Sequence, residues 1–186
     1  MTQPFRWSFS QWETYNACPA KWHYRSVQKL PGLPAGPAAA RGSLIHDTVE
    51  QYIKGADASV LHEAIKPKYV AVFDEFKNCP SVKCEDETKR ELGTIVPGTT
   101  AVTIFDVSRG ADCRMWIGEW KSGKPKPTHP DQRSLYALSA LALPGIDRVE
   151  VTTYYLEDTG KPETTMLDTA TAEPVRMVWQ LSLIHI

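Results

Sequence analysis

The sequence lacks the features of membrane, secreted and disordered proteins. No apolar run reaches the ~18 residues of a transmembrane helix, and the first residues lack the apolar stretch of a signal peptide. Internal repeats and low-complexity linkers are missing as well. The four cysteines have no closely paired spacing, which argues against a disulfide scaffold and a self-contained zinc site. We therefore expect a soluble cytoplasmic protein with reduced thiols, in the host cytoplasm if a phage encodes it.

Neither sign of charge dominates, because 21 Lys and Arg face 22 Asp and Glu. With 42% hydrophobic residues, the 186-residue chain can bury a core, which excludes bulk disorder. The charges are nevertheless uneven. Residues 1–41 and 120–133 are basic, with balances of +4 and +3, whereas 42–119 and 134–186 each carry −4. Two basic islands in an acidic chain are typical of a groove for a polyanion, although charge runs are more often solvated faces.

Helical and strand patterns separate along the chain. The spacing of Ser10 and Glu13 is typical of a capping box and predicts a helix start, and the Pro- and Gly-rich residues 30–37 predict a loop. The predicted helices cover 10–17, 19–24, 40–54, 60–76 (bent at Pro67) and 129–143. The predicted strands cover 91–96, 101–107, 114–120, 149–156 and 161–168. This order predicts one mixed α/β domain, with a three-stranded meander, a crossover helix and one or two further strands.

Residues 117–124, which read Ile-Gly-Glu-Trp-Lys-Ser-Gly-Lys, carry the most informative chemistry. Alternate side chains of a strand share a face, so Glu119 and Lys121 point the same way. If the preceding hairpin turns near Asp112, Asp106 lies opposite Glu119 with Cβ atoms about 5 Å apart. Taken alone, a Glu-x-Lys triplet is more often an exposed hairpin with ordinary charge alternation.

Two carboxylates at this separation repel each other unless a proton or a cation lies between them. Hard divalent cations such as Mg²⁺ and Mn²⁺ suit an all-oxygen site of this kind. Lys121 stands one strand repeat from Glu119, where it can orient a water or balance the charge of a phosphate. The residues therefore predict a metal site at Asp106 and Glu119, with Asp112 as the alternative acid.

Five short motifs follow one another along the chain. They are Ser8-Phe9-Ser10 leading to Tyr15, Cys18-Pro19 and Trp22; Gly42-Ser43-Leu44-Ile45-His46; Asp106; Glu119-Trp120-Lys121-Ser122-Gly123; and Gln132-Arg133-Ser134-Leu135-Tyr136. In these motifs and their order, residues 8–157 resemble the PD-(D/E)XK nuclease superfamily, in its RecB-like exonuclease branch and particularly the phage-borne members. The resemblance implies a restriction-endonuclease-like core, in which helices flank a mixed central β-sheet.

The resemblance also implies roles for single residues. Asp106, Glu119 and the backbone carbonyl of Trp120 would hold the metal, and His46 would add a ligand from the second long helix. Lys121 would be the catalytic lysine. A His beside apolar neighbours is otherwise more often a satisfied helix residue than a ligand.

The implied DNA contacts come from the helix that follows. Gln132 and Tyr136 lie four residues apart on one helical face and would border the site, unless they only cap and pack the helix. The basic islands, with Arg41, Lys124 and Arg133, would hold neighbouring phosphates and make binding depend on salt. The N-terminal aromatic residues could stack on unpaired bases, although most of them are expected in the core.

These features predict a metal-dependent DNA nuclease, with exonuclease action favoured, in phage or prokaryotic recombination, repair or DNA processing. Its partners would be DNA and a helicase or recombination protein, and no membrane. One alternative is a non-catalytic DNA-binding or nuclease-partner module that retains the fold. Another is an unrelated α/β domain, in which Asp106 and Glu119 would lie on opposite faces of the sheet.

The two ends of the chain give two further expectations. Some members of this branch carry a four-cysteine iron–sulfur cluster, and Cys18 fits its first position. No cysteine follows Cys113, so the chain cannot complete such a cluster. Residues 181–186 read as a non-native tail, and we expect a single nuclease-like domain over 1–180, truncated at its C-terminus, with a cysteine-bearing tail missing.

Overall fold

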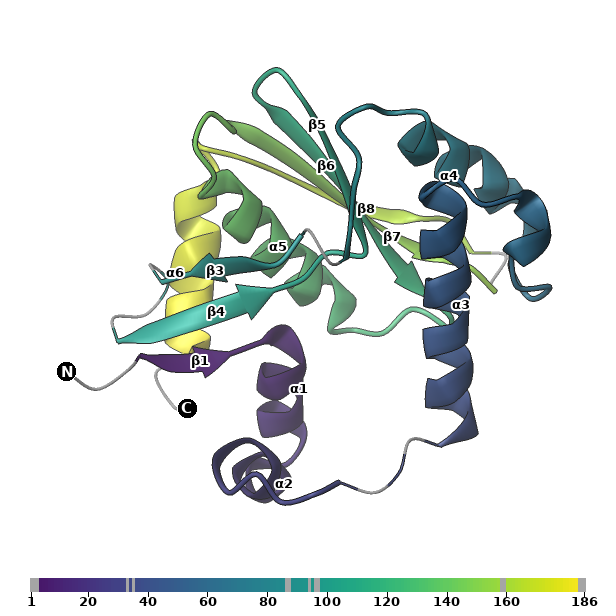
Figure 1. The fold of residues 1–186 in the computed structure, drawn as a ribbon. Helices are drawn as coiled ribbons and strands as arrows, with labels where there is room; N and C mark the ends of the chain where they lie inside the picture. Colours follow the sequence, from purple (N-terminus) through teal and green to yellow (C-terminus); the bar gives the residue numbers. More distant parts are fainter. Residues whose placement is uncertain are drawn as a thin grey trace.

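Two β-sheets and the helices around them form the chain (Figure 1). The computed structural model describes residues 4–32, 34, 36–85, 88–93, 95, 98–157 and 160–183. The larger sheet has five strands in the order β2-β5-β6-β7-β8. Its strands are β2 (Lys83–Cys84), β5 (Val107–Ala111), β6 (Arg114–Lys121), β7 (Arg148–Tyr155) and β8 (Glu163–Asp168). The smaller sheet pairs β1 (Phe5–Trp7), β4 (Thr99–Thr103) and β3 (Arg90–Leu92) in the order β1-β4-β3.

The larger sheet is mixed because one of its connections is a helical crossover. β5 and β6 form an antiparallel hairpin, and α5 (His129–Leu141) then carries the chain to β7, which pairs with β6 in parallel. Parallel neighbours need such a crossover, whereas β8 returns antiparallel along the outer side of β7. This arrangement confirms the mixed α/β fold with helices flanking a sheet.

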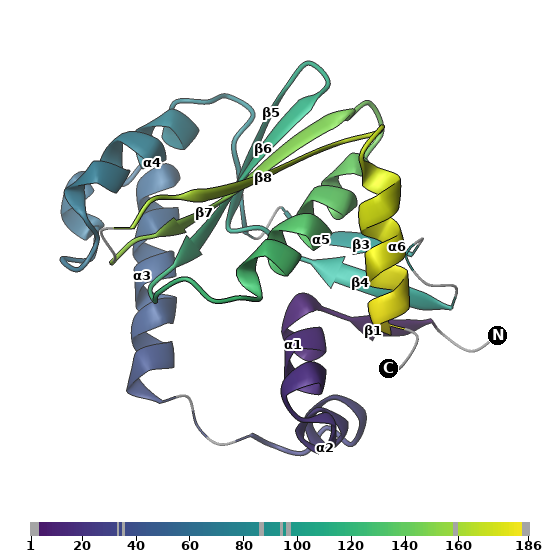
Figure 2. The same cartoon turned by 180° about the vertical axis from the view of Figure 1, so that it is seen from behind.

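The remaining helices cover the sheets from two sides. They are α1 (Phe9–Ala17), α2 (Pro19–Trp22), a π-helix (His23–Val27), α3 (Pro37–Ile53), short 3₁₀ turns (Ala58–Val60 and Pro67–Tyr69), α4 (Val70–Lys77) and α6 (Ala172–Leu183). In the view from behind, α3 and α4 lie at the left end of the large sheet and α6 lies at its right end (Figure 2). Helix α5 lies between them, below the strands. In the part of the chain that the structure describes, no helix has both the length and the apolar character needed to cross a bilayer.

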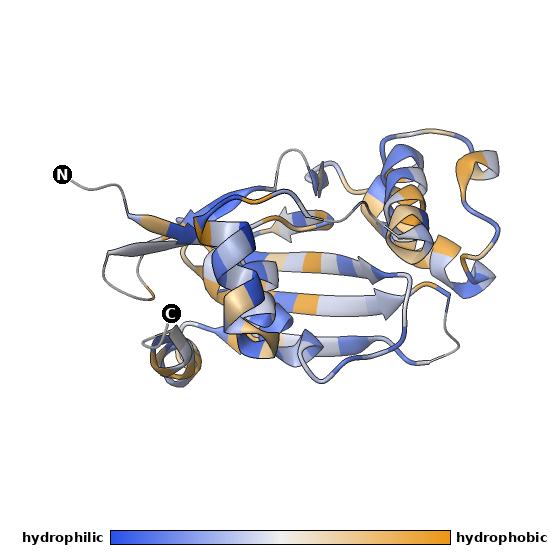
Figure 3. Cartoon of the chain, turned by 90° about the horizontal axis from the view of Figure 1, so that it is seen from below, coloured by the Kyte–Doolittle hydropathy of each residue, from blue (hydrophilic) through white to orange (hydrophobic). Residues whose placement is uncertain are grey.

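Strand β6 contributes side chains to both hydrophobic clusters of the protein. Ile117 packs with Phe105, Leu135 and the α5 side, whereas Trp120 packs with Phe73 and the α3–α4 side. Apolar residues recur along the strands and on the α3–α4 pair (Figure 3). Each fully buried side chain of this size contributes about 1.5–3 kcal/mol, so β6 is held from both faces. The end of this rigid strand carries the predicted site.

Three local predictions are wrong. Helix α1 starts at Phe9 with Ser8 as its N-cap, so Ser10 and Glu13 form no capping box. Glu13 instead accepts a hydrogen bond from the Thr128 hydroxyl at 2.8 Å. The predicted helix over 60–76 is regular only from Val70, because Ala58–Val60 and Pro67–Tyr69 are 3₁₀ turns and the residues between them are irregular.

The predicted strand over 101–107 is two strands in different sheets, so the three predicted strands form no single meander. β4 ends at Thr103, and β5 begins at Val107. Between them the backbone of Phe105 bonds to a side chain instead of a strand: its N–H donates to Thr88 Oγ1 at 3.0 Å and its carbonyl accepts from the same hydroxyl at 2.6 Å. In the predicted non-native tail, residues 181–183 continue α6, and 184–186 lie outside the described residues.

Candidate active site

The two predicted carboxylates lie where the β5–β6 hairpin ends. The ladder runs from Ala111↔Arg114 to Val107↔Gly118, which makes Asp106 and Glu119 the next residues on the two strands. The turn at Asp112, which has φ +53°, confirms the predicted hairpin. Asp112 therefore lies at the opposite end of the ladder, and Asp106 is the acid that neighbours Glu119.

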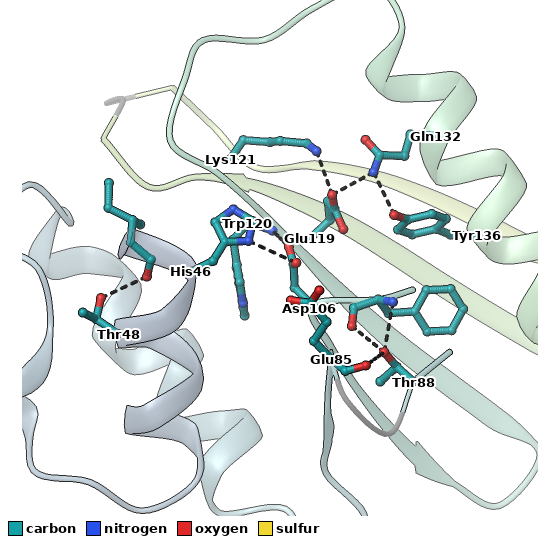
Figure 4. Close-up of polar contacts among 12 residues, drawn as sticks. His46, Thr48, Glu85, Thr88, Asp106, Glu119, Trp120, Lys121, Gln132 and Tyr136 are labelled. Atoms are coloured by element: carbon teal, nitrogen blue, oxygen red, sulfur yellow. Dashed lines mark hydrogen bonds and ion pairs between the residues drawn. The ribbon is translucent and has the colours of Figure 1, made fainter. Parts of the chain in front are cut away.

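Helix α3 and strand β6 both bind the Asp106 carboxylate. Its Oδ2 accepts a hydrogen bond from the Trp120 backbone N–H at 2.6 Å, and its Oδ1 lies 3.2 Å from His46 Nδ1 (Figure 4). Gly42, one turn before His46, permits this approach, since a Cβ there would lie only 3.2 Å from Ser122 Oγ. The glycine of the Gly-x-x-x-His motif thus has a packing reason.

Glu119 is buried, with 5% of its surface exposed. Its Oε1 accepts hydrogen bonds from Lys121 Nζ at 2.7 Å and from Gln132 Nε2 at 2.8 Å. Its Oε2 is buried and has no hydrogen-bond partner in the described part of the chain. A buried carboxylate oxygen without a partner costs about 1–3 kcal/mol or more, so this atom needs a partner that the protein does not supply.

The charges of the site shift one another's pKa values. Burial, and then the charge of Asp106, raises the pKa of Glu119 to about 7. Burial alone would lower the pKa of His46, but the hydrogen bond to Asp106 and the negative charges nearby raise it to about 9. Likewise, the charge of Glu119 outweighs burial and raises the pKa of Lys121. These values describe a site with concentrated negative charge, which favours any added cation.

The Gln-x-x-x-Tyr motif of α5 faces the same centre. Gln132 Nε2 reaches both Glu119 and the hydroxyl of Tyr136, at 2.8 and 2.9 Å. The Tyr136 ring packs on Phe105 with centroids 5.1 Å apart. Burial and the charge of Glu119 raise the pKa of Tyr136 well above its usual value, so the phenol stays neutral. The spacing predicted that both residues border the site.

Two hollows border the site and meet at Ile104 and Tyr136. One, of about 340 Å³, is lined by Lys121 and Gln132 together with residues of α1 and the loop before α5; we call it the catalytic hollow. The other, of about 510 Å³, is lined by His46, Asp106 and Glu85. Ile104 and Tyr136 line both, so the two form one groove on either side of these residues. A groove of this size accommodates a nucleotide-sized ligand.

The site offers oxygen donors for a divalent cation. The described ranges contain no ready cluster of three His, Cys, Asp or Glu ligands. Even so, Glu119 presents one unpartnered oxygen beside Asp106, and carboxylate oxygens suit Mg²⁺ and Mn²⁺. The N–H and C=O of one strand residue point to the same side, so the Trp120 carbonyl faces the edge where its N–H meets Asp106. The residues present therefore fit a hard cation.

Arg133 departs from its predicted place. It is buried, and its guanidinium donates to Glu163 at 3.0 Å and to Thr165 at 3.1 Å on β8. These contacts hold Arg133 against the sheet, so it is not available to DNA in the groove. One step along α5 turns the side chain of Arg133 by about 100° from that of Gln132, so the helical period alone indicates that the two do not share a face.

The other predicted residues lie on the surface. Arg41 pairs with Glu157 at 2.8 Å, and Lys124 is exposed on the loop after β6. Cys18 is exposed and unpaired, between α1 and α2.

Two lining residues were missed from the sequence. Lys126 lines the catalytic hollow, and its place in the same basic island as Lys124 was the available signal. Glu85 lines the His46 side, where burial and the charge of Asp106 raise its pKa. No pattern in the sequence linked Glu85 to the site, because Glu85 and Asp106 are distant in the sequence and line one hollow only in the folded chain.

Comparisons with known proteins bear on the N-terminal half of the sequence and on the fold. A family model described as the PD-(D/E)XK nuclease superfamily matches residues 6–93, which include the Gly42–His46 motif. The fold is similar to an exonuclease candidate of Eubacterium rectale, at a TM-score of 0.50 and 10% identity, over 94% of this chain and 77% of that chain. No curated protein sequence matches.

Two further solved structures are similar at lower scores. SSO0001 has a TM-score of 0.47 and 14% identity, over 98% of this chain and 79% of that one. LHK-Exo in complex with dAMP has a TM-score of 0.47 and 14% identity, over 98% and 87%, and is also described as an alkaline exonuclease from Laribacter hongkongensis. The superfamily predicted from the motifs is also the one whose family model matches, so over residues 6–93 the chain is similar to the PD-(D/E)XK nuclease superfamily.

Proposed function

We propose that the protein is a divalent-metal-dependent deoxyribonuclease that hydrolyses phosphodiester bonds, with exonuclease action favoured. The observation that carries this proposal is the meeting of Asp106, Glu119 and Lys121 at the end of one hairpin, beside a groove. Asp106, Glu119, the Trp120 carbonyl and His46 would hold the cation. When bound, Mg²⁺ or Mn²⁺ lowers the pKa of water and neutralises charge on the scissile phosphate.

The protein's own residues supply orientation and charge. Lys121 Nζ donates a hydrogen bond to Glu119 at 2.7 Å. The same ammonium group can instead donate to a water molecule or to a phosphate oxygen in the groove. In hydrolysis a water oxygen forms a bond to phosphorus while the bond from phosphorus to the leaving oxygen breaks. Lys121 then stabilises the negative charge that develops on the phosphate oxygens. Gln132, bonded to Glu119, keeps that carboxylate in one orientation.

The test is cleavage of linear DNA by the purified protein in Mg²⁺ or Mn²⁺. Lys121→Ala should lower the rate by about 10²–10³-fold, the usual cost of losing one charge-stabilising group. Lys161→Ala, at an exposed position on another part of the surface, should leave the rate unchanged. Equal rates for the wild type and Lys121→Ala, both folded by circular dichroism, would contradict the proposal.

The same measurements address the non-catalytic alternative. Salt-dependent DNA binding without cleavage in any divalent cation would favour a DNA-binding module that keeps the fold. A role in phage or prokaryotic recombination or repair, with a helicase or recombination partner, belongs to the proposal as well. Isolation of such a partner with the active protein would support that role.

A further inference from the structure

The N-terminal helical segment carries basic side chains and has no acidic side chains near them in the sequence. Residues 14–46 contain no Asp or Glu. Lys21 lies on α2, Arg25 on the π-helix and Lys29 two residues after the π-helix ends, and all three are exposed. Among the described residues none of the three has a carboxylate partner. Like charges gathered in one short segment repel one another, so the segment favours a bound polyanion.

Lys29 occupies a backbone conformation that suits glycine. Its φ is +57°, just after the π-helix, where the Leu30 N–H bonds to the Tyr24 carbonyl at 3.0 Å. Helices often end with glycine in this left-handed conformation, because any Cβ strains it. A lysine in this strained conformation makes Lys29 a candidate for a functional side chain.

Three hollows connect this segment to the candidate active site. Arg25, Ser26 and Lys29 line a hollow of about 270 Å³, which we call the basic hollow. It shares Ser10 with the catalytic hollow. On its other side it shares Ser26 and Lys29 with a third hollow of about 600 Å³. The hollows thus follow one another from Lys121 across α1 to α2, the helices at the lower edge of Figure 1.

The third hollow is lined by aromatic and basic side chains, and we call it the aromatic hollow. Phe5 is 39% exposed there and meets the largely buried Trp22 edge to face, with ring centroids 6.0 Å apart. Lys29 lines the same hollow, as does Arg6, which is ion-paired with Glu91. An exposed ring beside cationic groups is typical of surfaces on which unpaired bases stack while their phosphates meet the cations.

From this arrangement we propose that the aromatic and basic hollows bind single-stranded DNA and guide it to the catalytic hollow. The proposal rests on the proposed function, since it takes DNA as the substrate. Bases of a duplex are stacked on one another and cannot reach Phe5, so the surface selects a single strand. Lys29 lies between the two hollows and would contact the phosphate that joins successive nucleotides.

The test measures DNA binding in a chelator, by fluorescence anisotropy, so that it does not depend on cleavage. A labelled single-stranded oligonucleotide should bind more tightly than a duplex of the same length. The Arg25→Ala/Lys29→Ala variant should lose about tenfold or more in affinity for the single strand, and Phe5→Leu about five- to tenfold. Lys83→Ala/Lys161→Ala, which removes the same charge at exposed positions elsewhere, should change the affinity by less than twofold.

Lys29→Gly separates binding from folding. Glycine relieves the left-handed backbone, so this variant should unfold at the same or a higher temperature, yet bind the single strand more weakly. Hydrolysis of thymidine 5′-(p-nitrophenyl phosphate), which is too short to reach the hollows, should stay unchanged in all these variants. Unchanged hydrolysis of this small substrate together with weaker binding of the single strand would support the proposal.

Two outcomes would overturn the proposal. One is single-strand affinity in Arg25→Ala/Lys29→Ala equal to that of the charge-matched control. The other is a duplex that binds as tightly as the single strand and loses affinity equally in the variants. In both cases cleavage by the wild type would leave the nuclease proposal standing. No binding and no cleavage by the wild type would remove both.

Discussion

The Trp120 backbone N–H donates a 2.6 Å hydrogen bond to the Asp106 carboxylate, and this contact joins the end of β6 to the chain between the two sheets. Because Trp120 is locked in the α3–α4 cluster, with its ring 5.2 Å from Phe73, the carboxylate is anchored to a rigid element. Glu119 and Lys121 flank Trp120 and share the opposite face. One tryptophan therefore fixes the positions of three chemically active side chains.

Glu119 is expected to lower the stability of the metal-free protein. Its pKa rises from 4.5 to about 7 on folding, so the native state favours the protonated acid. The stability that this group contributes is full below pH 4.5 and is lost as the pH rises through about 7. In a chelator at pH 8, Glu119→Gln should therefore increase the free energy of unfolding by about 2 kcal/mol, and at pH 4 it should have little effect.

Thermal or urea unfolding of the two proteins at both pH values checks this expectation. Addition of Mn²⁺ should reverse the order at pH 8, because only the wild type gains stability by binding the cation. Destabilisation by Glu119→Gln in the chelator at pH 8 would show that Glu119 serves packing instead.

His46 is expected to contribute to cation affinity from outside the sheet. Its Nδ1 lies 3.2 Å from Asp106, on a helix that Gly42 allows to approach. His46→Ala should weaken Mn²⁺ binding by about 10–100-fold, as the loss of a ligand or of its hydrogen-bonded neighbour usually does. Calorimetric titration with Mn²⁺ measures this change, and the exposed His23→Ala serves as the matched control. Equal affinities in His46→Ala and His23→Ala would remove His46 from the site.

His129 makes the protein sensitive to acid. It is buried, its Nδ1 lies 3.0 Å from the Tyr155 hydroxyl, and burial with the nearby charges of Lys121 and Lys126 lowers its pKa from 6.5 to about 4. The folded state therefore prefers the neutral ring, and its contribution is full above pH 6.5 and lost as the pH falls toward 4.

His129→Asn keeps a short polar group but removes this titration. The difference in unfolding free energy between wild type and variant should shrink by about 2 kcal/mol between pH 7 and pH 4. Urea unfolding over this range measures the difference. If the difference in unfolding free energy between wild type and variant is the same at all pH values, His129 has the same pKa in the folded and the unfolded state.

Gly118 permits the close packing of the hairpin next to the site. A Cβ at this position would lie 2.7 Å from Val107 Cγ1 and 3.0 Å from the Trp120 ring. Gly118→Ala should destabilise the protein by about 1–3 kcal/mol through overpacking. Gly110→Ala is the matched control in β5, since its nearest contact would be an ordinary 3.6 Å. Equal urea midpoints for the two variants would contradict this account of Gly118.

Local rules in the sequence predicted the hairpin that carries Glu119 and Lys121, whereas contacts between distant residues were not predictable. Glu119, Lys121 and the turn at Asp112 obey strand alternation, which is a local rule, and the ladder follows it. The split between β4 and β5 was not predictable, because the backbone of Phe105 bonds to Thr88 across 17 residues. Glu85 was missed for the same reason. Long-range side-chain contacts of this kind leave no periodic pattern in the sequence.

Crystals soaked in Mn²⁺ test the central claim most directly, because anomalous scattering locates the ion without assumptions about activity. The account predicts one strong peak between Asp106 and Glu119, with oxygen ligands at about 2.0–2.4 Å. The peak should be absent from crystals of Glu119→Gln soaked in the same way. The same soak is made with crystals that contain DNA in the groove. If a saturating concentration of Mn²⁺ leaves no peak between the two carboxylates in these crystals, the account is contradicted.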